Sequence, residues 1–565
     1  MAELLTIRGL SIGLAGPQRE AATAKVLVDD ISFSLATGRT LGLIGESGAG
    51  KSTIGLAALG FFRAGLKPLA GQVLFEGRDL LSLPRAELEA LRRTRLAYVA
   101  QSAGAAFNPA HTLGQQITEN LLRNGKAGRA TARRRAEELV ALLGLPEPRR
   151  FLDRFPHQVS GGQLQRAMTA MALCQEPRLI VFDEPTTALD VTTQAGVLLA
   201  IRDAIAATGV SALYISHDLP VVAQIADEIL VLRHGRAVEH GATGDILSRP
   251  RADYTRRLVT AGRARPPRGA ATARPPVLTA ERIGMAYRQG TQVLDDVSLS
   301  LAAGETLALV GQSGSGKTTL GRVITGLHPD AEGALTLLGA PLPLALGRRS
   351  GEQLRRLQIV QQIPDAALNP RQTVGAVLSR PLTLYDRVRG RQAQRRRVEE
   401  LLQAVELDPA LLERMPAALS GGQKQRVCIA RALAAEPDVI VCDEPTSALD
   451  PLVAEGVLDL LARLQAQTGI ALLFITHDIA IVRALAHSVA IMAHGRIVRQ
   501  GPTREALAPP FDAETERLLD AVPEMETGWL TGWRARQVSG TASHGRAPAT
   551  PDASPPVREG LVFPG

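Results

Sequence analysis

Two Gly-rich segments of the same pattern are suited to binding the phosphates of a nucleotide. Residues 45–52 read GESGAGKS and residues 311–318 read GQSGSGKT, and both fit the P-loop pattern G-x-x-x-x-G-K-[ST]. In this pattern backbone N–H groups surround the phosphates, the lysine reaches the outer phosphates, and the Ser or Thr hydroxyl ligates Mg²⁺. Two such loops in matched strand–loop–helix contexts predict two sites for a nucleoside triphosphate.

The residues assigned to phosphate binding are Gly45, Glu46, Ser47, Gly48, Ala49, Gly50, Lys51, Ser52 and Thr53 in the first half, and Gly311, Gln312, Ser313, Gly314, Ser315, Gly316, Lys317, Thr318 and Thr319 in the second. Among these, Ser52 and Thr318 are the predicted metal ligands.

An apolar run that ends in an Asp–Glu pair follows each P-loop. Leu-Ile-Val-Phe precedes Asp183 and Glu184, and Val-Ile-Val-Cys precedes Asp443 and Glu444. Hydrolysis of a nucleoside triphosphate requires neutralised phosphate charge and a positioned water. We expect Asp183 and Asp443 to hold Mg²⁺, and Glu184 and Glu444 to polarise the attacking water. An isolated Asp–Glu pair is usually a solvated strand end, but repetition at matched positions favours the catalytic interpretation.

The chain is an internal repeat with nearly constant spacing between equivalent residues. The separations are 266 for Lys51 and Lys317, 261 for Gln101 and Gln362, and 260 for Ser160 and Ser420, for Asp183 and Asp443, and for His217 and His477. Such regular spacing indicates a duplicated domain.

A Ser-Gly-Gly-Gln segment precedes each Asp–Glu pair and completes the motif set. Taken alone, the segment predicts a tight turn before a helix with Ser as the N-cap, and a helix N-terminus also binds anions. Together with the P-loops, the Asp–Glu pairs, the Ala-Leu-Asp triplets and the two histidines, it resembles the ATPase subunits of ABC transporters. The resemblance covers about residues 3–260 and 277–522. The segments comprise Ser160, Gly161, Gly162 and Gln163, and Ser420, Gly421, Gly422 and Gln423.

The resemblance implies roles for residues that carry no signal alone. It implies that Gln101 and Gln362 contact Mg²⁺ and sense a membrane subunit, and that His217 and His477 contact the γ-phosphate of ATP. It also implies that the Ser-Gly-Gly-Gln segment of one half closes over the P-loop of the other. The two composite sites would join Lys51, Glu184 and His217 to Ser420, Gly422 and Gln423, and Lys317, Glu444 and His477 to Ser160, Gly162 and Gln163.

One asymmetry concerns the adenine base. The family usually places an aromatic residue before its first hairpin to stack on adenine. Tyr287 has this position in the second half, whereas Leu14 has it in the first. We therefore expect the first site to bind ATP more weakly.

The arrangement of apolar runs predicts the elements that position these motifs. Each half begins with β-rich stretches, continues through a Leu-periodic, Arg-rich helical region and ends in alternating apolar strands and helices. We expect an α/β fold of two tandem P-loop ATPase domains. Each would have a mainly parallel core sheet, an antiparallel β subdomain and a helical subdomain. The predicted boundaries are 3–260, a Pro/Arg-rich linker at 261–276, 277–522, and a disordered C-terminal tail at 523–565.

Composition narrows the cellular context. No stretch approaches 18 consecutive apolar residues, and the N-terminal residues do not read as an export signal. The three cysteines form no C-x-x-C pair and are expected to be core thiols. The net charge of +8 raises the possibility of nucleic-acid binding, but the excess arginines lie largely in the linker without interleaved aromatic residues. We expect no nucleic-acid partner.

Within the family, the chain resembles the oligopeptide, dipeptide and nickel importer group, including glutathione-type members with two fused ATPases. Asn-Pro follows Phe107 and Leu368, and residues 252–258 read ADYTRRL, similar to that group's H-P-Y-T-x-x-L segment. The copy at 512–518 has Glu514 in place of Tyr. No cysteine follows residue 442, so we expect no C-terminal iron–sulfur cluster.

The resemblance implies a peripheral protein at the cytoplasmic face of the inner membrane. Its partners would be two permease subunits and a periplasmic solute-binding protein. The Gln101 and Gln362 regions, with the following Asn-Pro turns, would form two grooves for permease helices, and Phe107 and Leu368 are candidates for that contact.

Three other classes are weighed against this interpretation. ATPases of sugar importers are the nearest, but their second site is commonly degenerate, and both sets are complete here. Tandem ATPases that act on ribosomes usually carry a long charged helical linker, which the Pro-rich residues 261–276 do not resemble. DNA-repair ATPases of this superfamily carry zinc-binding cysteine pairs, which this sequence lacks.

Overall fold

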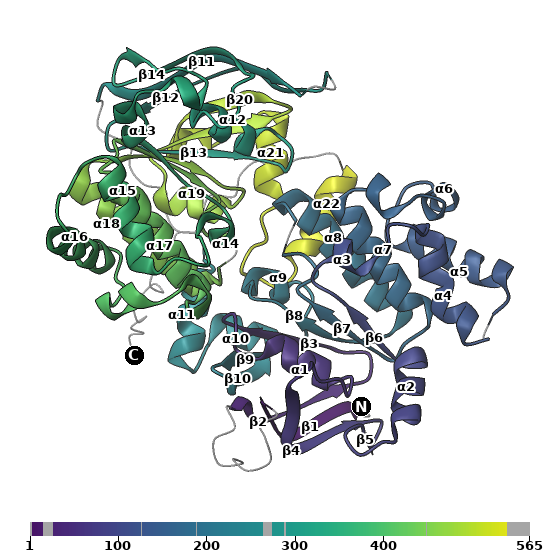
Figure 1. Cartoon of the computed structure of the whole chain (residues 1–565). Coiled ribbons are helices and arrows are strands. Elements are labelled where there is room, and N and C mark those ends of the chain that lie inside the picture. Colours follow the sequence, from purple (N-terminus) through teal and green to yellow (C-terminus); the bar gives the residue numbers. More distant parts are fainter. Residues whose placement is uncertain are drawn as a thin grey trace, which may run out of the picture.

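The structure is a computed structural model that describes residues 3–14, 26–125, 127–187, 189–263, 274–287, 290–447 and 449–539. Two halves of matching architecture face each other, the first in purple to blue and the second in teal to green (Figure 1). Each half has an antiparallel sheet, a larger mixed sheet and a set of helices, which confirms the predicted fold class.

The antiparallel sheet of each half comes from the N-terminal β-rich stretch. Alternating residues such as Leu5, Ile7 and Ile12 are buried, which is the period-2 pattern of a strand with one buried face. The strand orders are β2-β1-β4-β5 and β12-β11-β14-β15. The strands are β1 (Glu3–Leu14), β2 (Val26–Ala36), β4 (Leu66–Phe75) and β5 (Arg78–Asp79), and β11 (Pro276–Ala286), β12 (Gln292–Ala302), β14 (Glu332–Leu337) and β15 (Ala340–Pro341).

The six-stranded sheets carry the motif-bearing loops. Their orders are β10-β9-β3-β8-β7-β6 and β16-β17-β18-β13-β19-β20, with parallel pairing except at the β9–β10 and β19–β20 edges. The strands are β3 (Thr40–Gly45), β6 (Leu96–Val99), β7 (Leu179–Asp183), β8 (Ser211–Ile215), β9 (Glu228–Arg233) and β10 (Arg236–Ala242), and β13 (Thr306–Gly311), β16 (Leu357–Val360), β17 (Val439–Asp443), β18 (Ala471–Ile475), β19 (Ser488–Ala493) and β20 (Arg496–Pro502).

Parallel pairing gathers the predicted site at one edge of each sheet. In the first half, β3 ends at the P-loop, β7 ends at Asp183, and β8 ends two residues before His217. These central strands are buried along their whole length, as expected for a sheet covered on both faces. The carboxyl ends of parallel strands are where ligands bind in such sheets.

The first half contains helices α1 (Lys51–Ala57), α2 (Arg85–Thr94), α3 (Ala103–Ala106), α4 (Leu113–Arg123), α5 (Arg129–Leu142), α6 (Pro148–Leu152), α7 (Gly161–Cys174), α8 (Val191–Thr208), α9 (Leu219–Ala223), α10 (Thr243–Ser248) and α11 (Asp253–Ala261), with a 3₁₀ turn η2 (Pro156–Gln158). Helices α3 to α7 pack together as the predicted helical region, away from the antiparallel sheet (Figure 1).

The second half contains α12 (Lys317–Ile324), α13 (Gly351–Arg356), α14 (Pro364–Ala367), α15 (Val374–Leu384), α16 (Arg391–Ala404), α17 (Gly421–Leu433), α18 (Pro451–Thr468), α19 (Ile479–Leu485), α20 (Thr503–Ala506), α21 (Ala513–Asp520) and α22 (Trp529–Ser539), with 3₁₀ turns η3 (Leu346–Arg348), η4 (Pro409–Glu413) and η5 (Pro416–Ala418). The halves meet in matched pairs, because α11 packs on α18 and α21 packs on α8.

The segment after α21 differs from the expected disordered tail at 523–565. Residues 523–539 lie within the described part of the chain and end in α22, which packs on α8 of the first half. The physical reason is local: Trp529 and Leu530 are buried there. Residues 540–565, like most of the predicted linker (264–273), fall outside the described residues.

In the part of the chain that the structure describes, we find no helix long and apolar enough to cross a membrane. All three cysteines are buried and unbonded to sulfur, as their apolar surroundings in the sequence predicted.

Candidate functional site

Each P-loop holds its lysine through the loop's own carbonyl groups. Lys51 Nζ donates to the carbonyl oxygens of Gly45 at 2.8 Å and Glu46 at 3.0 Å. Lys317 makes the equivalent two bonds, both at 2.8 Å. Burial lowers the pKa of both ammonium groups, against the opposing effect of nearby carboxylates. Each lysine is therefore fixed at the mouth of the loop with its cation facing the position expected for phosphate.

The loop backbone leaves room for an anion. Gly48 and Gly314 have φ angles of 81° and 79°, and a Cβ built on either would meet no atom within 4 Å. Only glycine adopts this left-handed conformation without strain. In the second loop, Ser315 Oγ is buried without a hydrogen-bond partner among the described residues. Open space beside backbone amides, with a buried ammonium behind, fits the terminal phosphates of a nucleotide.

The predicted metal ligands meet in both halves. Ser52 Oγ donates to Asp183 Oδ1 at 2.7 Å, and Thr318 Oγ1 donates to Asp443 Oδ1 at 3.2 Å. Hydroxyl and carboxylate oxygens are the hard ligands that Mg²⁺ prefers. The donor set therefore fits the metal that the P-loop pattern implies.

One residue of the first site escaped sequence reasoning. Tyr98, on β6, donates its hydroxyl to Asp183 Oδ2 at 2.7 Å, so both oxygens of that carboxylate are bonded. Burial, then this hydrogen bond, raises the pKa of Tyr98. The matching position on β16 is Ile359, which has no hydroxyl.

The predicted base of the first site is held by three side chains. Glu184 Oε2 lies 3.3 Å from His217 Nδ1, and it accepts from Gln101 Nε2 at 3.2 Å and from Thr187 Oγ1 at 3.1 Å. Burial alone would raise the pKa of Glu184, but its hydrogen bond and ion pair with His217, with the Lys51 charge, bring that pKa below its ordinary value.

The second site repeats this arrangement. Glu444 Oε2 accepts from Gln362 Nε2 at 2.8 Å, and Glu444 Oε1 lies 3.1 Å from His477 Nδ1. The pKa of Glu444 is also lowered, since the His477 contact and the Lys317 charge outweigh burial. The Glu444 hydrogen bond raises the pKa of His477. Each glutamate and its histidine therefore stabilise one another's charged forms.

Both glutamates have a strained backbone. The φ angles of Glu184 and Glu444 are 49° and 46°, in the left-handed region that non-glycine residues avoid. Such conformations cost on the order of 1–3 kcal/mol and cluster at functional sites. The Glu184 N–H donates to the Ile215 carbonyl at 2.9 Å, and the equivalent bond to Ile475 is 3.0 Å. The sheet edge thus fixes each carboxylate in position.

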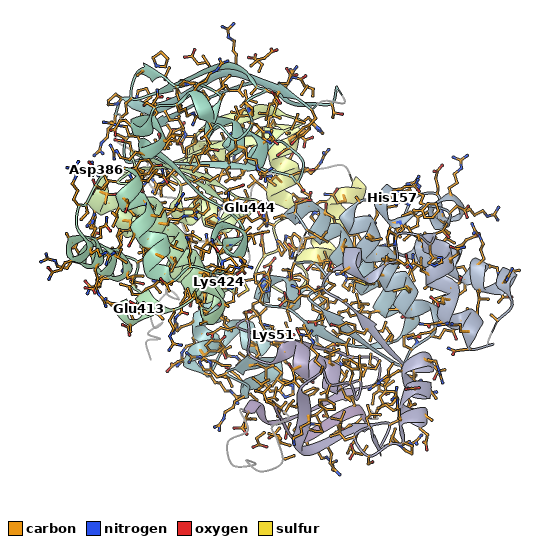
Figure 2. All side chains as sticks on the ribbon, viewed as in Figure 1. Lys51, His157, Asp386, Glu413, Lys424 and Glu444 are labelled. Carbon is orange, nitrogen blue, oxygen red and sulfur yellow. The ribbon has the colours of Figure 1, made fainter. Side chains whose placement is uncertain are left out.

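A cavity of about 1120 Å³ joins the two sets of residues. Figure 2 shows Lys51 and Glu444 on the sides of the two halves that face each other. The predicted site residues that line the cavity are Ser47, Gly48, Gly50, Lys51, Ser52, Thr53, Gln101, Glu184 and His217, and Tyr287, Ser313, Gly314, Gly316, Lys317, Thr318, Thr319, Gln362, Glu444 and His477. The two halves therefore contribute to one space.

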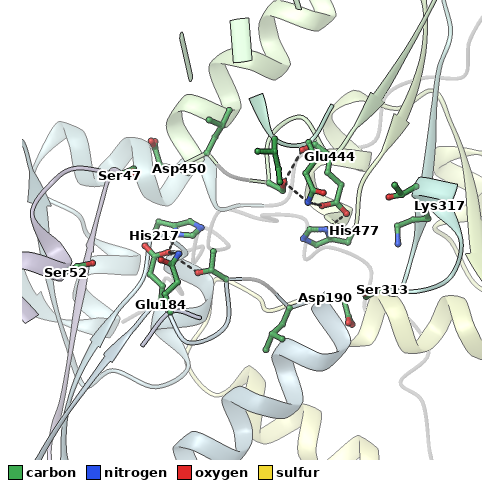
Figure 3. Close-up of a pocket in the computed structure, with 18 of the residues that line it drawn as sticks. Ser47, Ser52, Glu184, Asp190, His217, Ser313, Lys317, Glu444, Asp450 and His477 are labelled. Atoms are coloured by element: carbon green, nitrogen blue, oxygen red, sulfur yellow. Dashed lines mark hydrogen bonds and ion pairs between the residues drawn. The ribbon is translucent and has the colours of Figure 1, made fainter. Parts of the chain in front are cut away.

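Each half also contributes an aspartate to the other half's loop. Asp450 lies beside Ser47, and Asp190 lies beside Ser313 (Figure 3). Each carboxylate acts against burial to raise the pKa of the P-loop lysine across the cavity. The sequence offered a signal for this pair, because both end the repeated Ala-Leu-Asp triplets, but it did not reveal their position.

The Ser-Gly-Gly-Gln segments begin helices as predicted. Ser160 and Ser420 are the N-caps of α7 and α17, and each forms a reciprocal capping box with the Gln three residues on. Among the described residues that line the cavity, no member of either segment appears. In this arrangement the segments are separate from the P-loop residues that they were predicted to cover.

The residues Phe107 and Leu368 are placed differently from the expectation that they contact a permease. Their side chains are only 4% and 3% exposed, and they pack in the apolar cores of their own halves. Neighbouring residues Ala105 and Ala366, on α3 and α14, are exposed. A partner would therefore meet this outer face rather than the two buried side chains.

Comparison with known proteins is consistent with this site. The sequence model of the ABC transporter family matches residues 28–187 and 294–447. The chain is 38% identical over 535 residues to the peptidoglycan transport ATP-binding protein YejF of Agrobacterium fabrum, covering 93% of this chain and 97% of that protein. It is also 38% identical over 541 residues to the glutathione import ATP-binding protein GsiA of Pectobacterium atrosepticum, covering 88% and 86% respectively. GsiA of Escherichia coli O157:H7 is 36% identical over 565 residues, covering 93% and 90%.

Proposed function

Because this chain belongs to the ABC transporter family, in a group of ATP-binding proteins with two fused ATPase domains, we propose that it powers the import of peptides or related small solutes. Proteins of this family bind and hydrolyse ATP, and this chain carries two of their ATPase domains. The observation that carries the proposal is the pair of complete Lys–Glu–His sets opening on one shared cavity.

Each ATP would be held by one P-loop and hydrolysed beside the same half's glutamate. Lys51 and Lys317 would neutralise the outer phosphates, while Glu184 and Glu444 orient and polarise the attacking water. When Mg²⁺ is bound, Ser52 and Asp183, or Thr318 and Asp443, would hold it, with Gln101 and Gln362 nearby, and it would neutralise phosphate charge. His217 and His477 would leave their glutamates to contact the γ-phosphate.

We further propose that closure of the halves completes two composite sites. Ser420, Gly422 and Gln423 would cap the ATP at Lys51, and Ser160, Gly162 and Gln163 would cap the ATP at Lys317. The positions of Asp190 and Asp450 support this proposal, since each already lies at the opposite P-loop. An inward movement of α7 and α17, which begin at the Ser-Gly-Gly-Gln segments, would then bring their N-terminal amides to the γ-phosphates.

The chain would act at the cytoplasmic face of the inner membrane with two permease subunits and a periplasmic solute-binding protein. The names of the relatives support an importer of peptide-like solutes. The Gln101 and Gln362 loops support the coupling route, since each glutamine bonds the catalytic glutamate and precedes the exposed face at Ala105 or Ala366. A permease helix on that face would move the glutamine and hence the base.

The test is a double variant on the exposed face, Ala105→Arg with Ala366→Arg, in the reconstituted transporter. We expect solute uptake to fall at least about tenfold while the ATPase rate without permeases stays unchanged, because neither residue lines the ATP cavity. Ala207→Arg, at an exposed position near the end of α8, is the matched control and should transport normally. Normal uptake by the double variant, or failure of the chain to co-purify with any permease from its host, would contradict the importer proposal.

A further inference from the structure

The C-terminal end of the second half reaches across to the first half. After α21, residues 523–537, which we name the C-terminal strap, lead into α22 (yellow, Figure 1), which packs on α8 of the first half. None of the described residues that line the ATP cavity belongs to this strap. The strap therefore lies outside that cavity.

A single buried glutamine fixes the backbone of the strap. Gln224, at the end of α9 and only 7% exposed, donates from Nε2 to the carbonyl oxygens of Glu524 at 3.0 Å and Glu526 at 2.8 Å. Its Oε1 accepts from the Leu530 N–H at 3.1 Å. Both ends of one amide are thus satisfied by the other half's main chain, which specifies the path of the strap.

The apolar side chains of the strap belong to the core of the first half. Trp529 is 5% exposed and Leu530 is fully buried, and both lie in one apolar cluster with Leu198 of α8 and Val222 of α9. Trp533 stacks on Trp529 with 6.2 Å between ring centroids. Removal of these side chains from water stabilises the contact.

Polar contacts surround this apolar centre. Arg202 donates to Thr531 Oγ1 at 2.9 Å, and Arg534 forms an ion pair with Asp203 at 2.8 Å. Both first-half residues lie on α8. A buried apolar centre with a polar rim is the usual anatomy of a specific protein interface.

The second half lacks the groups that receive the strap. With the 260-residue offset of the repeat, Gln224 corresponds to Ala484, Arg202 to Ala462 and Asp203 to Arg463. None of these can make the bonds described above. The receiving face is therefore present once in the molecule, although the elements that form it are present twice.

The strap contacts helices α8 and α9, and each of these helices begins just after a residue that lines the cavity. Helix α8 begins directly after Asp190, which lies at the second P-loop, and α9 begins two residues after His217. A rigid attachment at this place links the second half to the first behind the catalytic loops.

We propose that the C-terminal strap is a constitutive latch that keeps the two halves paired when no nucleotide is bound. The cavity then opens and closes about the strap contact, and the second half does not drift away from the first between cycles. This function does not depend on which solute is transported or on the identity of the permeases.

The latch is tested by cutting the linker of the full-length folded protein at a protease site inserted within residues 264–273, without nucleotide. The cleaved halves should co-sediment in analytical ultracentrifugation. Gln224→Ala, which copies the second half's alanine, removes three hydrogen bonds and should weaken association about tenfold. Leu530→Asp buries an unpaired charge and should weaken it by about a hundredfold or more. Ala535→Ser, at an exposed position of α22, is the control and should associate normally.

Tryptophan fluorescence provides a second readout, because the chain's only two tryptophans, Trp529 and Trp533, both lie in the strap. In the uncut protein their emission should stay blue-shifted and protected from acrylamide, with and without ATP in the Glu184→Gln/Glu444→Gln variant. The Gln224→Ala variant retains the apolar side chains of the contact. Its ability to bind ATP will show that the variant protein is folded. Equal dissociation of wild-type and Gln224→Ala halves, or exposure of the tryptophans on ATP binding, would overturn the latch.

Discussion

The two ATP sites agree in their reacting groups and differ in the residues that support them. The lysines and histidines have equivalent partners in both halves, whereas the Thr187 hydroxyl donates to the Glu184 carboxylate and the Ser447 hydroxyl donates to the Glu444 main-chain carbonyl. The carboxylate proposed to hold Mg²⁺ is bonded by two hydroxyls in the first half and by one in the second. The comparison teaches that the chemistry constrains the reacting groups strictly and their supports loosely.

The difference in support changes the electrostatics of the second site. Burial raises the pKa of Asp443, the neighbouring Glu444 charge adds to this, and the Thr318 hydrogen bond opposes it. In the first half Tyr98 supplies an additional donor to Asp183. We therefore expect the first site to hold its carboxylate in one orientation more firmly.

The residues expected to contact adenine favour the second half instead. Strand register makes Leu14 and Tyr287 equivalent, since Leu5 pairs with Phe75 as Leu278 pairs with Leu337, nine residues before each. Tyr287 lines the cavity, and Leu14 is absent from the described residues that line it. We therefore expect the first half to bind the metal ion more tightly and the second half to bind the adenine ring more tightly.

Glutamine substitutions test whether both sites turn over, and we expect the largest effect from them. Glu184→Gln and Glu444→Gln should each lower the ATPase rate about a hundredfold or more, because the water loses its orienting carboxylate. ATP should remain bound, which filter binding with radiolabelled ATP can measure. If one single variant hydrolyses ATP at the wild-type rate, that site is dispensable and the agreement between the halves is only geometric.

Exchange of the tyrosine tests the difference at the metal. Tyr98→Phe, in a Glu444→Gln background in which only the first site keeps its glutamate, should raise the Mg²⁺ concentration for half-maximal residual activity by about tenfold. Ile359→Tyr in the Glu184→Gln background should lower it at the second site. Direct Mn²⁺ binding, measured by electron paramagnetic resonance, provides a readout independent of turnover. Unchanged metal affinity in both variants would assign Tyr98 a packing role alone.

Exchange of Leu14 and Tyr287 tests the expected difference in adenine binding between the two sites. Leu14→Tyr should tighten ATP binding at the first site several-fold, which corresponds to about 1 kcal/mol for an aromatic platform. Tyr287→Leu should weaken the second site by a similar factor. Titration of a fluorescent ATP analogue into variants with the other site blocked will measure both. Equal affinities of the two wild-type sites would remove the asymmetry.

The smallest effect that we expect is on stability as a function of pH. The His217 pKa is raised by Glu184 although burial opposes this, so the pair stabilises the fold at low pH and loses that contribution as pH rises through the histidine's folded pKa. Because the Glu184 pKa is lowered, its contribution is lost only when pH falls through that lower value. Urea unfolding should therefore show a greater cost of Glu184→Gln at about pH 6 than at about pH 9. Glu444→Gln should show the same pH dependence. A loss in the free energy of unfolding that does not vary with pH would contradict the ion pair.

The sequence predicted those parts of the molecule that contiguous residues determine. A P-loop, an Asp–Glu pair after an apolar strand and a Ser N-cap before a helix all depend on neighbours a few residues away, and the structure has them at the expected places. The roles of the site residues and the domain boundaries remain predictions. Position in the chain could not reveal the hydroxyl of Tyr98, because it meets a carboxylate 85 residues away.

Two further misses have the same physical origin. The sequence predicts a disordered tail after α21 because the stretch that follows Trp533 is rich in Ser, Pro, Ala, Gly and Thr, whereas the groups that bury Trp529 and Leu530 lie some 300 residues earlier. Phe107 and Leu368 were taken as surface contacts from their place in a motif, yet each fills the core beside an exposed turn. Burial depends on the whole fold, and a motif fixes only its local geometry.

Fusion of the two halves in one chain has a consequence for how such a protein can evolve. In a homodimer every mutation appears twice, so a strap and its receiving face would have to work in both directions or not at all. In this fused chain Gln224 and Ala484 can differ, because each position occurs only once in the assembled molecule. A change that favours one half need not be tolerated by the other. The C-terminal strap is thus a feature that selection can act on without altering its counterpart.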